Sequence, residues 1–255
     1  EILIGLVGSE MCIRDSIRTV ELLSEYGYQE VNLNLGCPSK TVVTKGCGAG
    51  FLDRPEELER FLDEIFAKCN IQISVKTRLG MEDASGFPEL MKLYNKFPMK
   101  ELIIHPRVQK DFYKNTPNLE MFAEAFAMST NPVCYNGDIF CVEDHQRICE
   151  RFPELDAVMS GRGTLTNPAL AREIRGGQAL TKAELRKFHD LVYHTYRAEV
   201  SGDRNVLFKM KELWFYMGPL FANNKKYLKK IKKSEKCIVY ESAVAELFSN
   251  EELIL

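Results

Sequence analysis

The sequence predicts a parallel α/β fold followed by a small all-α domain. Strand-like segments alternate with amphipathic helical segments over the first two thirds of the chain, which is typical of parallel βα units. Beyond residue 177 only helical periodicity remains. With 255 residues and a hydrophobic content of 45%, the chain can bury a large core. We therefore expect a globular protein made of two differently built parts.

The expected strands are short segments rich in β-branched and apolar residues. Their residue ranges are 31–35, 72–77, 101–105, 132–135 and 156–160. A polar turn and then a helical segment follow each strand, so we expect neighbouring strands to run parallel.

Amphipathic helices are expected between these strands. Asp53 is expected to cap the first of them, with Pro55 in its first turn. Apolar residues then recur at helical spacing at Leu58, Phe61, Leu62, Ile65 and Phe66. The same spacing follows the second and third strands, at Leu90, Leu93, Tyr94 and Phe97, and at Leu119, Phe122, Ala123 and Phe126. Each helix can therefore cover one face of a sheet.

The number of βα units leaves two sheet topologies open. A closed eight-stranded barrel needs about 250 residues, or roughly 30 per unit. The five expected units occupy residues 17–177. The sheet is therefore either open and doubly wound or a barrel whose first strands are absent from the sequence.

A helical domain is expected over residues 178–255. Thr181 and Glu184 have the spacing of a capping box, in which each residue satisfies a backbone N–H of the other. Apolar residues follow at helical spacing at Leu185, Phe188, Leu191 and Val192. The later segments 206–221 and 225–233 show no strand pattern, so we expect an all-α bundle.

Composition and charge narrow the function classes. No apolar run approaches a membrane span and no signal peptide opens the chain, so we expect a cytoplasmic protein. The eight cysteines lack the paired spacing of a zinc site, which predicts reduced thiols and no metal. The net charge is only −2, yet residues 225–236 hold seven lysines and one glutamate. This segment is either a phosphate-contacting helix or a solvated lysine-rich face.

Chemically distinctive residues follow all five expected strands. In parallel α/β folds the functional residues lie at the carboxyl ends of the strands. The five segments are Asn34-Leu35-Gly36-Cys37-Pro38, Lys76-Thr77-Arg78-Leu79-Gly80, His105-Pro106-Arg107, Asn136-Gly137-Asp138 and Gly161-Arg162-Gly163.

In this order the five segments resemble the tRNA-dihydrouridine synthase family, over about residues 26–216. The resemblance implies a TIM-type (β/α)8 barrel, incomplete here with about five βα units, followed by a helical tRNA-binding domain. It also implies an FMN enzyme that uses NADPH to reduce the C5–C6 bond of a uridine in tRNA. We further expect a monomer that contacts no membrane.

The resemblance assigns chemistry to residues of the first three strand ends. Cys37 would protonate C5 of the uracil, and an unperturbed thiol with a pKa of about 8.5 holds a proton at neutral pH. Cys47, in another glycine-rich loop, is the rival, and an inert buried thiol is the structural alternative. Lys76 would face the flavin near N1 and O2, because a buried ammonium needs a partner. His105 and Arg107 would orient the flavin or the target base.

The last two strand ends resemble the family's phosphate site. There, backbone N–H groups and one guanidinium would hold the FMN phosphate. The residues assigned to the flavin in this way are Asn136, Gly137, Asp138, Gly161 and Arg162. Two ordinary strand-to-helix turns are the structural alternative.

Contacts with tRNA are expected mainly from basic residues of the helical domain. The segment 209–216 and the basic helix resemble the family's tRNA-binding region, and lysines contact phosphates without reading sequence. The expected residues are Arg107, Lys209, Lys211, Lys229 and Lys230. The target uridine must also leave its stack to reach a flavin.

The first 16 residues depart from the family pattern. Relatives begin with three further strands, whereas residues 5–16 show neither strand nor helix periodicity and resemble a translated sequencing adapter. We therefore expect residues 1–16 to be non-native, residues 17–177 to form a partial barrel, and Cys12 to have no function. The alternative is that Ser9-Glu10-Met11 is a native strand end.

Two other function classes remain open. One is an FMN-barrel oxidoreductase that acts on a small pyrimidine, against which the basic helical domain argues. The other is a non-catalytic RNA-binding protein, against which Cys37 and Lys76 argue.

Overall fold

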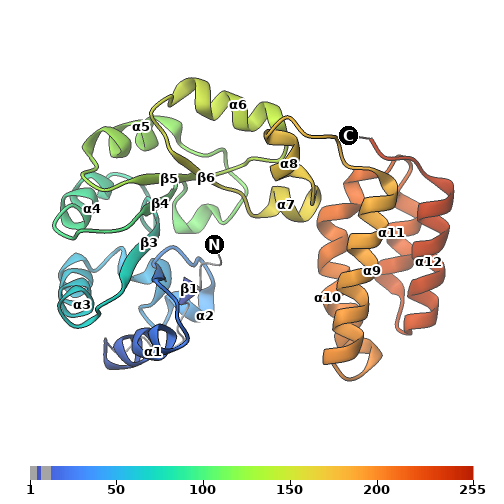
Figure 1. Ribbon diagram of the computed structural model, residues 1–255, viewed down its shortest axis with the longest axis horizontal. Coiled ribbons are helices and arrows are strands. Elements are labelled where there is room, and N and C mark those ends of the chain that lie inside the picture. Colours follow the sequence, from blue (N-terminus) through green and yellow to red (C-terminus); the bar gives the residue numbers. More distant parts are fainter. Residues whose placement is uncertain (1–4, 7–12, 255) are drawn as a thin grey trace. The chain divides into compact units, whose positions relative to one another are not determined.

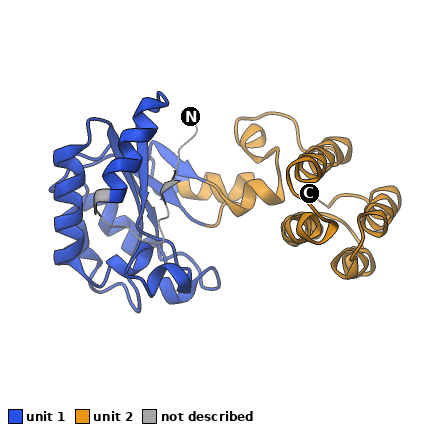
Figure 2. Ribbon diagram, turned by 90° about the horizontal axis from the view of Figure 1, so that it is seen from below, with its two compact units in different colours: residues 1–137, 149–159 blue, residues 138–148, 160–255 orange. Residues whose placement is uncertain are grey.

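The computed structural model describes residues 5–6 and 13–254, and the chain forms two compact units (Figures 1 and 2). The first unit comprises residues 1–137 and 149–159, and the second comprises 138–148 and 160–255. The second unit thus includes residues 160–177, which the sequence pattern groups with the barrel.

A six-stranded parallel sheet forms the centre of the first unit. Its strands are β1 (Gly5–Leu6), β2 (Glu30–Asn34), β3 (Gln72–Arg78), β4 (Leu102–His105), β5 (Val133–Asn136) and β6 (Ala157–Met159). The register pairs Leu33 with Val75, Val75 with Leu102, and Leu102 with Val133. All five strands expected from the sequence are confirmed, with ends that differ by at most one residue.

The strand order distinguishes a barrel from a doubly wound sheet. A doubly wound sheet reverses its strand order at a switch point, whereas the strands here follow one another from β1 to β6 without reversal. Successive helices lie along the outer face of the sheet (Figure 1). This is the arrangement of a (β/α)8 barrel, of which the described residues provide six strands.

Helices connect the strands of this sheet. The α-helices are α1 (Ile13–Glu25), α2 (Lys40–Val43), α3 (Pro55–Lys68), α4 (Phe87–Tyr94), α5 (Leu119–Met128) and α6 (Val142–Arg151). Two 3-10 helices, η1 (Gly48–Phe51) and η2 (Gln109–Asp111), lie in the loops after β2 and β4. The expected core face of α3 is confirmed, since Leu58, Phe61, Leu62 and Ile65 are all buried.

One segment has structure that its sequence pattern does not indicate, and one expected helix cap is wrong. Gly5 and Leu6 form a strand parallel to β2, and α1 begins at Ile13, although the sequence of 5–16 shows no such periodicity. Arg54 rather than Asp53 occupies the N-cap of α3 and makes no side-chain cap bond. A residue that precedes proline is disfavoured in helical conformation, which fixes the start of the helix at Pro55. Residues 9–11 and Cys12 lie outside the described residues, and the foreign origin of 5–16 stays a prediction.

The second unit is helical. Its α-helices beyond residue 160 are α7 (Arg162–Thr166), α8 (Leu170–Ile174), α9 (Lys182–Glu199), α10 (Asp203–Met217), α11 (Lys225–Lys233) and α12 (Cys237–Asn250). A 3-10 helix, η3 (Gly218–Leu220), follows α10. The predicted capping box is confirmed, because Glu184 N donates to Thr181 Oγ1 at 3.2 Å and Thr181 N donates to the Glu184 carboxylate at 3.0 Å.

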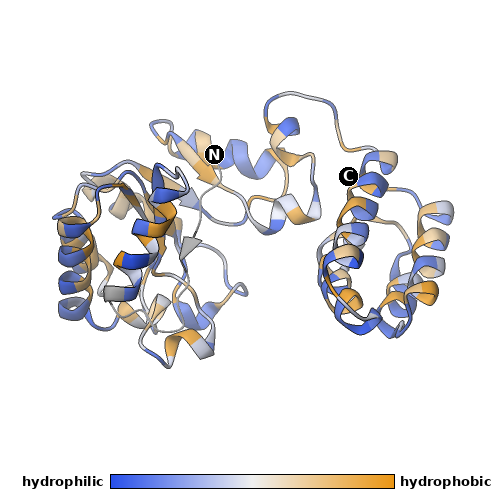
Figure 3. Cartoon of the chain, turned by 60° about the horizontal axis from the view of Figure 1, so that its bottom comes forward, coloured by the Kyte–Doolittle hydropathy of each residue, from blue (hydrophilic) through white to orange (hydrophobic). Residues whose placement is uncertain are grey.

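Apolar side chains from α9, α10, α11 and α12 form one core. Polar and apolar positions alternate along these helices, as expected for amphipathic segments (Figure 3). Leu185, Met210 and Leu247 are fully buried in this core. It also contains a polar chain, in which Trp214 Nε1 donates to Tyr240 Oη at 2.7 Å and that hydroxyl lies 2.6 Å from His189 Nε2.

Candidate functional site

Cys37 lies just beyond the carboxyl end of β2, in a loop whose backbone is held by its neighbours. Leu35 N donates to Lys76 O of β3 at 2.8 Å, and Ala49 N donates to Cys37 O at 3.1 Å. Gly48 has a φ of +54°, and a Cβ at this position would lie 2.9 Å from Cys37 Cβ. A glycine is therefore required where the 46–50 loop passes Cys37.

The environments of Cys37 and Cys47 differ. Cys37 is a free, half-buried thiol. Cys47 is 4% exposed, and its Sγ lies 3.7 Å from Lys45 O in its own loop. Of the two candidate proton donors, Cys37 is the more accessible to a substrate.

Lys76 is a half-buried ammonium near the carboxyl end of β3. Burial lowers the pKa of Lys76 to about 8, the Arg78 guanidinium lowers it as well, and the nearby Cys134 and Cys37 thiols act in the opposite direction. We find no hydrogen bond or ion pair from Lys76 Nζ to any described residue. An ammonium in this position favours an anionic partner.

Arg78, the last residue of β3, joins the loops that follow β2 and β4. It is 1% exposed, and its guanidinium donates to the carbonyl oxygens of Gly36 at 3.0 Å, Val108 at 3.0 Å and Phe112 at 2.9 Å. Burial lowers its pKa. Since Gly36 directly precedes Cys37, Arg78 fixes the position of the thiol loop against the loop after β4.

His105, the last residue of β4, and Arg107 form a buried pair. They are 5% and 2% exposed, and Arg107 Nη1 lies 3.1 Å from His105 Nε2. A guanidinium only donates, so Nε2 accepts and the imidazole proton of a neutral His105 is on Nδ1. The half-exposed ring of Tyr113 stacks on His105 with centroids 6.1 Å apart and lies 5.4 Å from the Arg78 guanidinium.

Arg78 belongs to one of the five sequence motifs, but the sequence predicts no role for it. Tyr113 belongs to none of these motifs. The position of Arg78 two residues after Lys76, on the same face of β3, is a signal that could have been used. Nothing in the sequence indicates that Tyr113 stacks on these two side chains, because the stacking depends on the path of the loop.

The expected phosphate-binding residues fall in both units. In the first unit, Asn136 Nδ2 donates to Met159 O at 2.8 Å and so links β5 to β6. At Gly137 an added Cβ would lie only 2.0 Å from Tyr135 Oη, so any other residue would require the buried Tyr135 ring to move. The close approach of Gly137 and Tyr135 is the physical reason for glycine at this turn.

In the second unit, Arg162 is paired with an acidic neighbour. Its Nη2 lies 2.5 Å from Asp138 Oδ1, and its guanidinium lies 5.4 Å from the centroid of Phe140. Gly161 is exposed and precedes α7, and an added Cβ at Gly163 would lie 1.9 Å from Ile139 O. Within the second unit, residues 138–139 and 162–163 therefore approach each other closely, with the Arg162 charge balanced by Asp138.

The four lysines expected to contact tRNA differ in whether they have a hydrogen-bond or ion-pair partner in the described chain. Lys211 Nζ donates to Ser234 O at 2.6 Å, at the carboxyl end of α11, and Lys230 Nζ lies 2.5 Å from Glu246 Oε2. Lys209 and Lys229 are exposed, and within the described chain neither ammonium has a hydrogen bond or an ion pair.

The structure thus brings four predicted residues together in the first unit. Cys37, Lys76, His105 and Arg107 lie at or near the carboxyl ends of three adjacent strands, and the Cys37 thiol is close enough to influence the Lys76 ammonium. Among residues 5–6 and 13–254, no group of three acidic, histidine or cysteine side chains is arranged to hold a metal ion. Within the same residues, no helix has the length and apolar character needed to cross a membrane.

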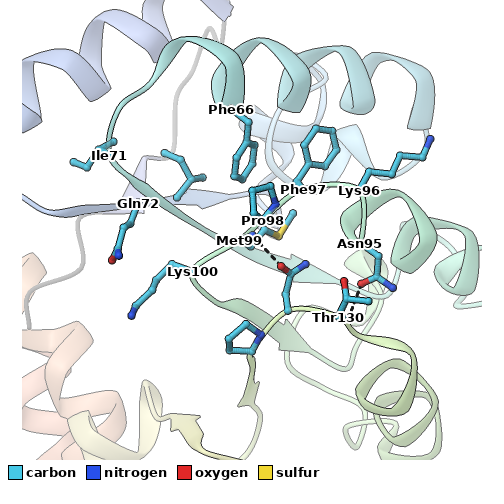
Figure 4. A pocket seen from close by; sticks show the side chains of 13 residues that line it. Phe66, Ile71, Gln72, Asn95, Lys96, Phe97, Pro98, Met99, Lys100 and Thr130 are labelled. Carbon is cyan, nitrogen blue, oxygen red and sulfur yellow. Dashed lines mark hydrogen bonds between the residues drawn. The ribbon is translucent and has the colours of Figure 1, made fainter.

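A cavity of about 660 Å³ lies at the opposite, amino-terminal end of the strands (Figure 4). The Phe66 and Phe97 rings stack with centroids 5.2 Å apart on its wall, and Met99 N donates to Asn131 Oδ1 at 2.9 Å. None of the predicted site residues lines this cavity. The chemically distinctive residues are therefore confined to the carboxyl ends of the strands.

A family model and the sequences of two relatives all match dihydrouridine synthases. A family model described as dihydrouridine synthase (Dus) matches residues 14–250. The tRNA-dihydrouridine(16) synthase of Pseudomonas putida is 29% identical over 192 residues, which cover 74% of this chain and 58% of that protein. A probable tRNA-dihydrouridine synthase of Helicobacter pylori is 27% identical over 252 residues, covering 96% of this chain and 74% of the relative.

The chain spans about half the length of several curated relatives, between 47% and 58% for four tRNA-dihydrouridine(16) synthases. Among solved structures, morphinone reductase in complex with tetrahydroNAD aligns with a TM-score of 0.48 at 16% identity. This alignment covers 66% of this chain and 49% of that chain.

Proposed function

The chain belongs to the dihydrouridine synthase family, and from this premise we propose that it reduces the C5–C6 bond of a uridine in tRNA, with FMN as cofactor and NADPH as reductant. The observation that carries the proposal is the half-exposed Cys37 thiol beside Lys76, whose ammonium has no carboxylate partner in the described chain. A proton donor next to an unpaired cation suits a reaction that adds a hydride and a proton to a double bond.

The residues of the site fit FMN. When bound, FMN supplies the hydride for C6 of the uracil. Lys76 would pair with the anionic edge of the reduced flavin, and its pKa of about 8 leaves it mostly protonated at neutral pH. The loop that Arg78 anchors would hold the Cys37 thiol where it donates a proton to C5.

The remaining predicted residues take supporting roles. The buried pair of His105 and Arg107 would orient the flavin or the target base. Asn136, Gly137, Asp138 and Gly161 would surround the FMN phosphate, with Arg162 as its cation. Because Arg162 is paired with Asp138, phosphate binding would require Arg162 to share or exchange this partner.

The helical unit would bind the tRNA. Lys209 and Lys229 are available for phosphate contacts, whereas Lys211 and Lys230 already have partners in the chain. Arg107, buried next to His105, would act on the target nucleotide rather than on the tRNA backbone.

Dihydrouridine formation in unmodified tRNA tests this function. The chain is supplied with FMN, NADPH and a tRNA transcript, and dihydrouridine is measured by mass spectrometry. We expect Cys37→Ala to reduce the rate at least 100-fold, as for loss of a general acid. Cys47→Ala, the matched control, should keep most of the activity.

The alternatives give different results. An oxidoreductase of small pyrimidines would oxidise NADPH with such a substrate and leave the tRNA unmodified. A non-catalytic RNA-binding protein would bind tRNA with the same affinity in the parent and in Cys37→Ala and would form no dihydrouridine in either.

A further inference from the structure

A second candidate binding site lies within the helical unit. A cavity of about 380 Å³ opens between α9 and α10, with Leu165 of α7 at its edge. Val192 of α9 and Leu213 of α10 belong to its apolar part, and Leu213 is only 8% exposed. The volume is within the usual range for small-ligand sites.

Four polar side chains also line this cavity. They are Tyr196 of α9 and Lys209, Glu212 and Tyr216 of α10. Lys209, Glu212 and Tyr216 follow one another at helical spacing, so they lie on the same face of α10. Within residues 5–6 and 13–254 we find no hydrogen bond or ion pair from any of these four side chains. The apolar part of the cavity is therefore bordered by two tyrosine side chains, one ammonium and one carboxylate. Their polar atoms have no partner among the described residues.

The chemistry of these groups selects among ligand classes. An aliphatic ligand would fill the apolar part of the cavity but would use neither the half-buried tyrosine rings for stacking nor the exposed Lys209 and Glu212 groups at its rim. A simple anion would be repelled by Glu212, and a metal ion by Lys209. A nucleobase has apolar faces that stack on tyrosine rings, and its edge presents both acceptors for an ammonium and donors for a carboxylate.

We propose that this cavity binds an unstacked nucleobase of RNA, between the rings of Tyr196 and Tyr216, with Lys209 and Glu212 contacting its edge. The inference rests on the proposed function, because a tRNA is then the RNA that supplies the base. This base is additional to the uridine that is reduced. The site would let the helical unit recognise an unpaired nucleotide of the tRNA rather than only its phosphates.

The test uses the full chain and two fluorescently labelled RNAs, a tRNA transcript and a mixed-sequence single strand of about 12 nucleotides. Dissociation constants are measured by anisotropy at two salt concentrations. We expect the Tyr196→Ala/Tyr216→Ala variant to bind both RNAs about tenfold more weakly, as for the loss of base stacking. The salt dependence should stay unchanged, because no charge is removed.

Phe208→Ala is the matched control, because Phe208 is a 69% exposed aromatic residue of α10 that does not line the cavity. Its affinity should stay within about twofold of the parent. Equal losses in the control and the double variant, or no loss in the double variant, would overturn the proposal. If the double variant unfolds, Tyr196→Leu and Tyr216→Leu, which keep apolar packing, provide the same comparison.

Failure of this proposal and failure of the proposed function give different results. A chain that forms dihydrouridine but whose RNA affinity is insensitive to Tyr196 and Tyr216 keeps its proposed function and loses this site. A chain that binds the single strand through the two tyrosines but forms no dihydrouridine keeps the site and loses the function. If the parent binds neither RNA, the cavity proposal is overturned.

Discussion

At the residue scale, Arg78 shows how one buried side chain holds the site together. Its three hydrogen bonds join the loop before Cys37 to the loop after β4. Arg78→Ala would leave two buried carbonyl oxygens and one partly buried carbonyl oxygen without their donor, at a cost of about 1–3 kcal/mol for each unsatisfied buried group before relaxation. We therefore expect a loss of several kcal/mol in the free energy of unfolding, measured by denaturant titration. Arg54→Ala, which removes an exposed pair with Glu57, should cost under about 1 kcal/mol.

Lys76 gives a pH-dependent prediction at the same scale. Its pKa of about 8 means that the ammonium is charged below this pH and neutral above it. If Lys76 pairs with an anionic part of FMN, the affinity for FMN falls as the pH rises from about 7 to 9. Lys76→Arg, which stays charged, should abolish this dependence, and Lys76→Met should bind FMN weakly at every pH. Fluorescence titration of FMN measures the effect, and a Lys76→Met variant with parental affinity at pH 7 would contradict it.

Residues of the candidate site could be predicted from the sequence where their position depends only on the strand that they follow or end. Cys37 and Lys76 stand at strand ends, and strand periodicity is enough to bring them to one edge of the sheet. The roles of Arg78 and Tyr113 depend on which carbonyls and rings the loops present, and loop paths carry little sequence signal. The pairing of Lys230 with Glu246 likewise depends on the packing of α11 against α12.

At the scale of elements, the helix α11 separates its lysines into two rows. Lys226 lies 3.9 Å from Glu251 Oε1, and Lys230 is paired with Glu246. Lys225, Lys229 and Lys232 are exposed at helical spacing, with no ion pair in the part of the chain that the structure describes. This second row therefore retains its positive charge for a partner.

The two rows predict different effects on tRNA binding. Lys229→Ala/Lys232→Ala should weaken binding and reduce the slope of log affinity against log salt by about two, or about one per lost phosphate contact. Lys226→Ala/Lys230→Ala removes the same charge from the paired row and should change the slope by less than one. Equal slopes for the two double variants would show that the rows are equivalent.

Element boundaries were predictable where the periodicity is long. The five expected strands and the core face of α3 agree with the structure because each has several residues of pattern. The strand β1 has only two residues, and no period can be recognised in so short a segment. It is a strand because it pairs with Asn32 and Leu33 of β2, which is a tertiary property.

At the scale of the whole molecule, the helical unit contains a buried histidine that links stability to pH. His189 is 2% exposed, and burial lowers its pKa to about 4. The unfolded chain has a histidine pKa of about 6.5 and so binds the proton more readily. Stability therefore falls as the pH drops from about 6.5 to 4, by about 3 kcal/mol. Fluorescence of Trp214, the single tryptophan, follows this unfolding. His189→Gln should give a flatter pH profile, and an equally steep one would contradict the prediction.

The number of strands in the sheet also determines how tightly the first unit can hold a cofactor. A closed barrel pairs every strand on both sides, whereas among the described residues no strand joins β1 to β6. Within residues 5–6 and 13–254, the outer sides of β1 and β6 have no strand partner, and six strands are available for the wall around FMN. We expect the 255-residue chain to bind FMN weakly and to lose it during gel filtration. Flavin absorbance per mole of purified protein measures this, and one FMN retained per chain in a stable monomer would show that six strands are sufficient.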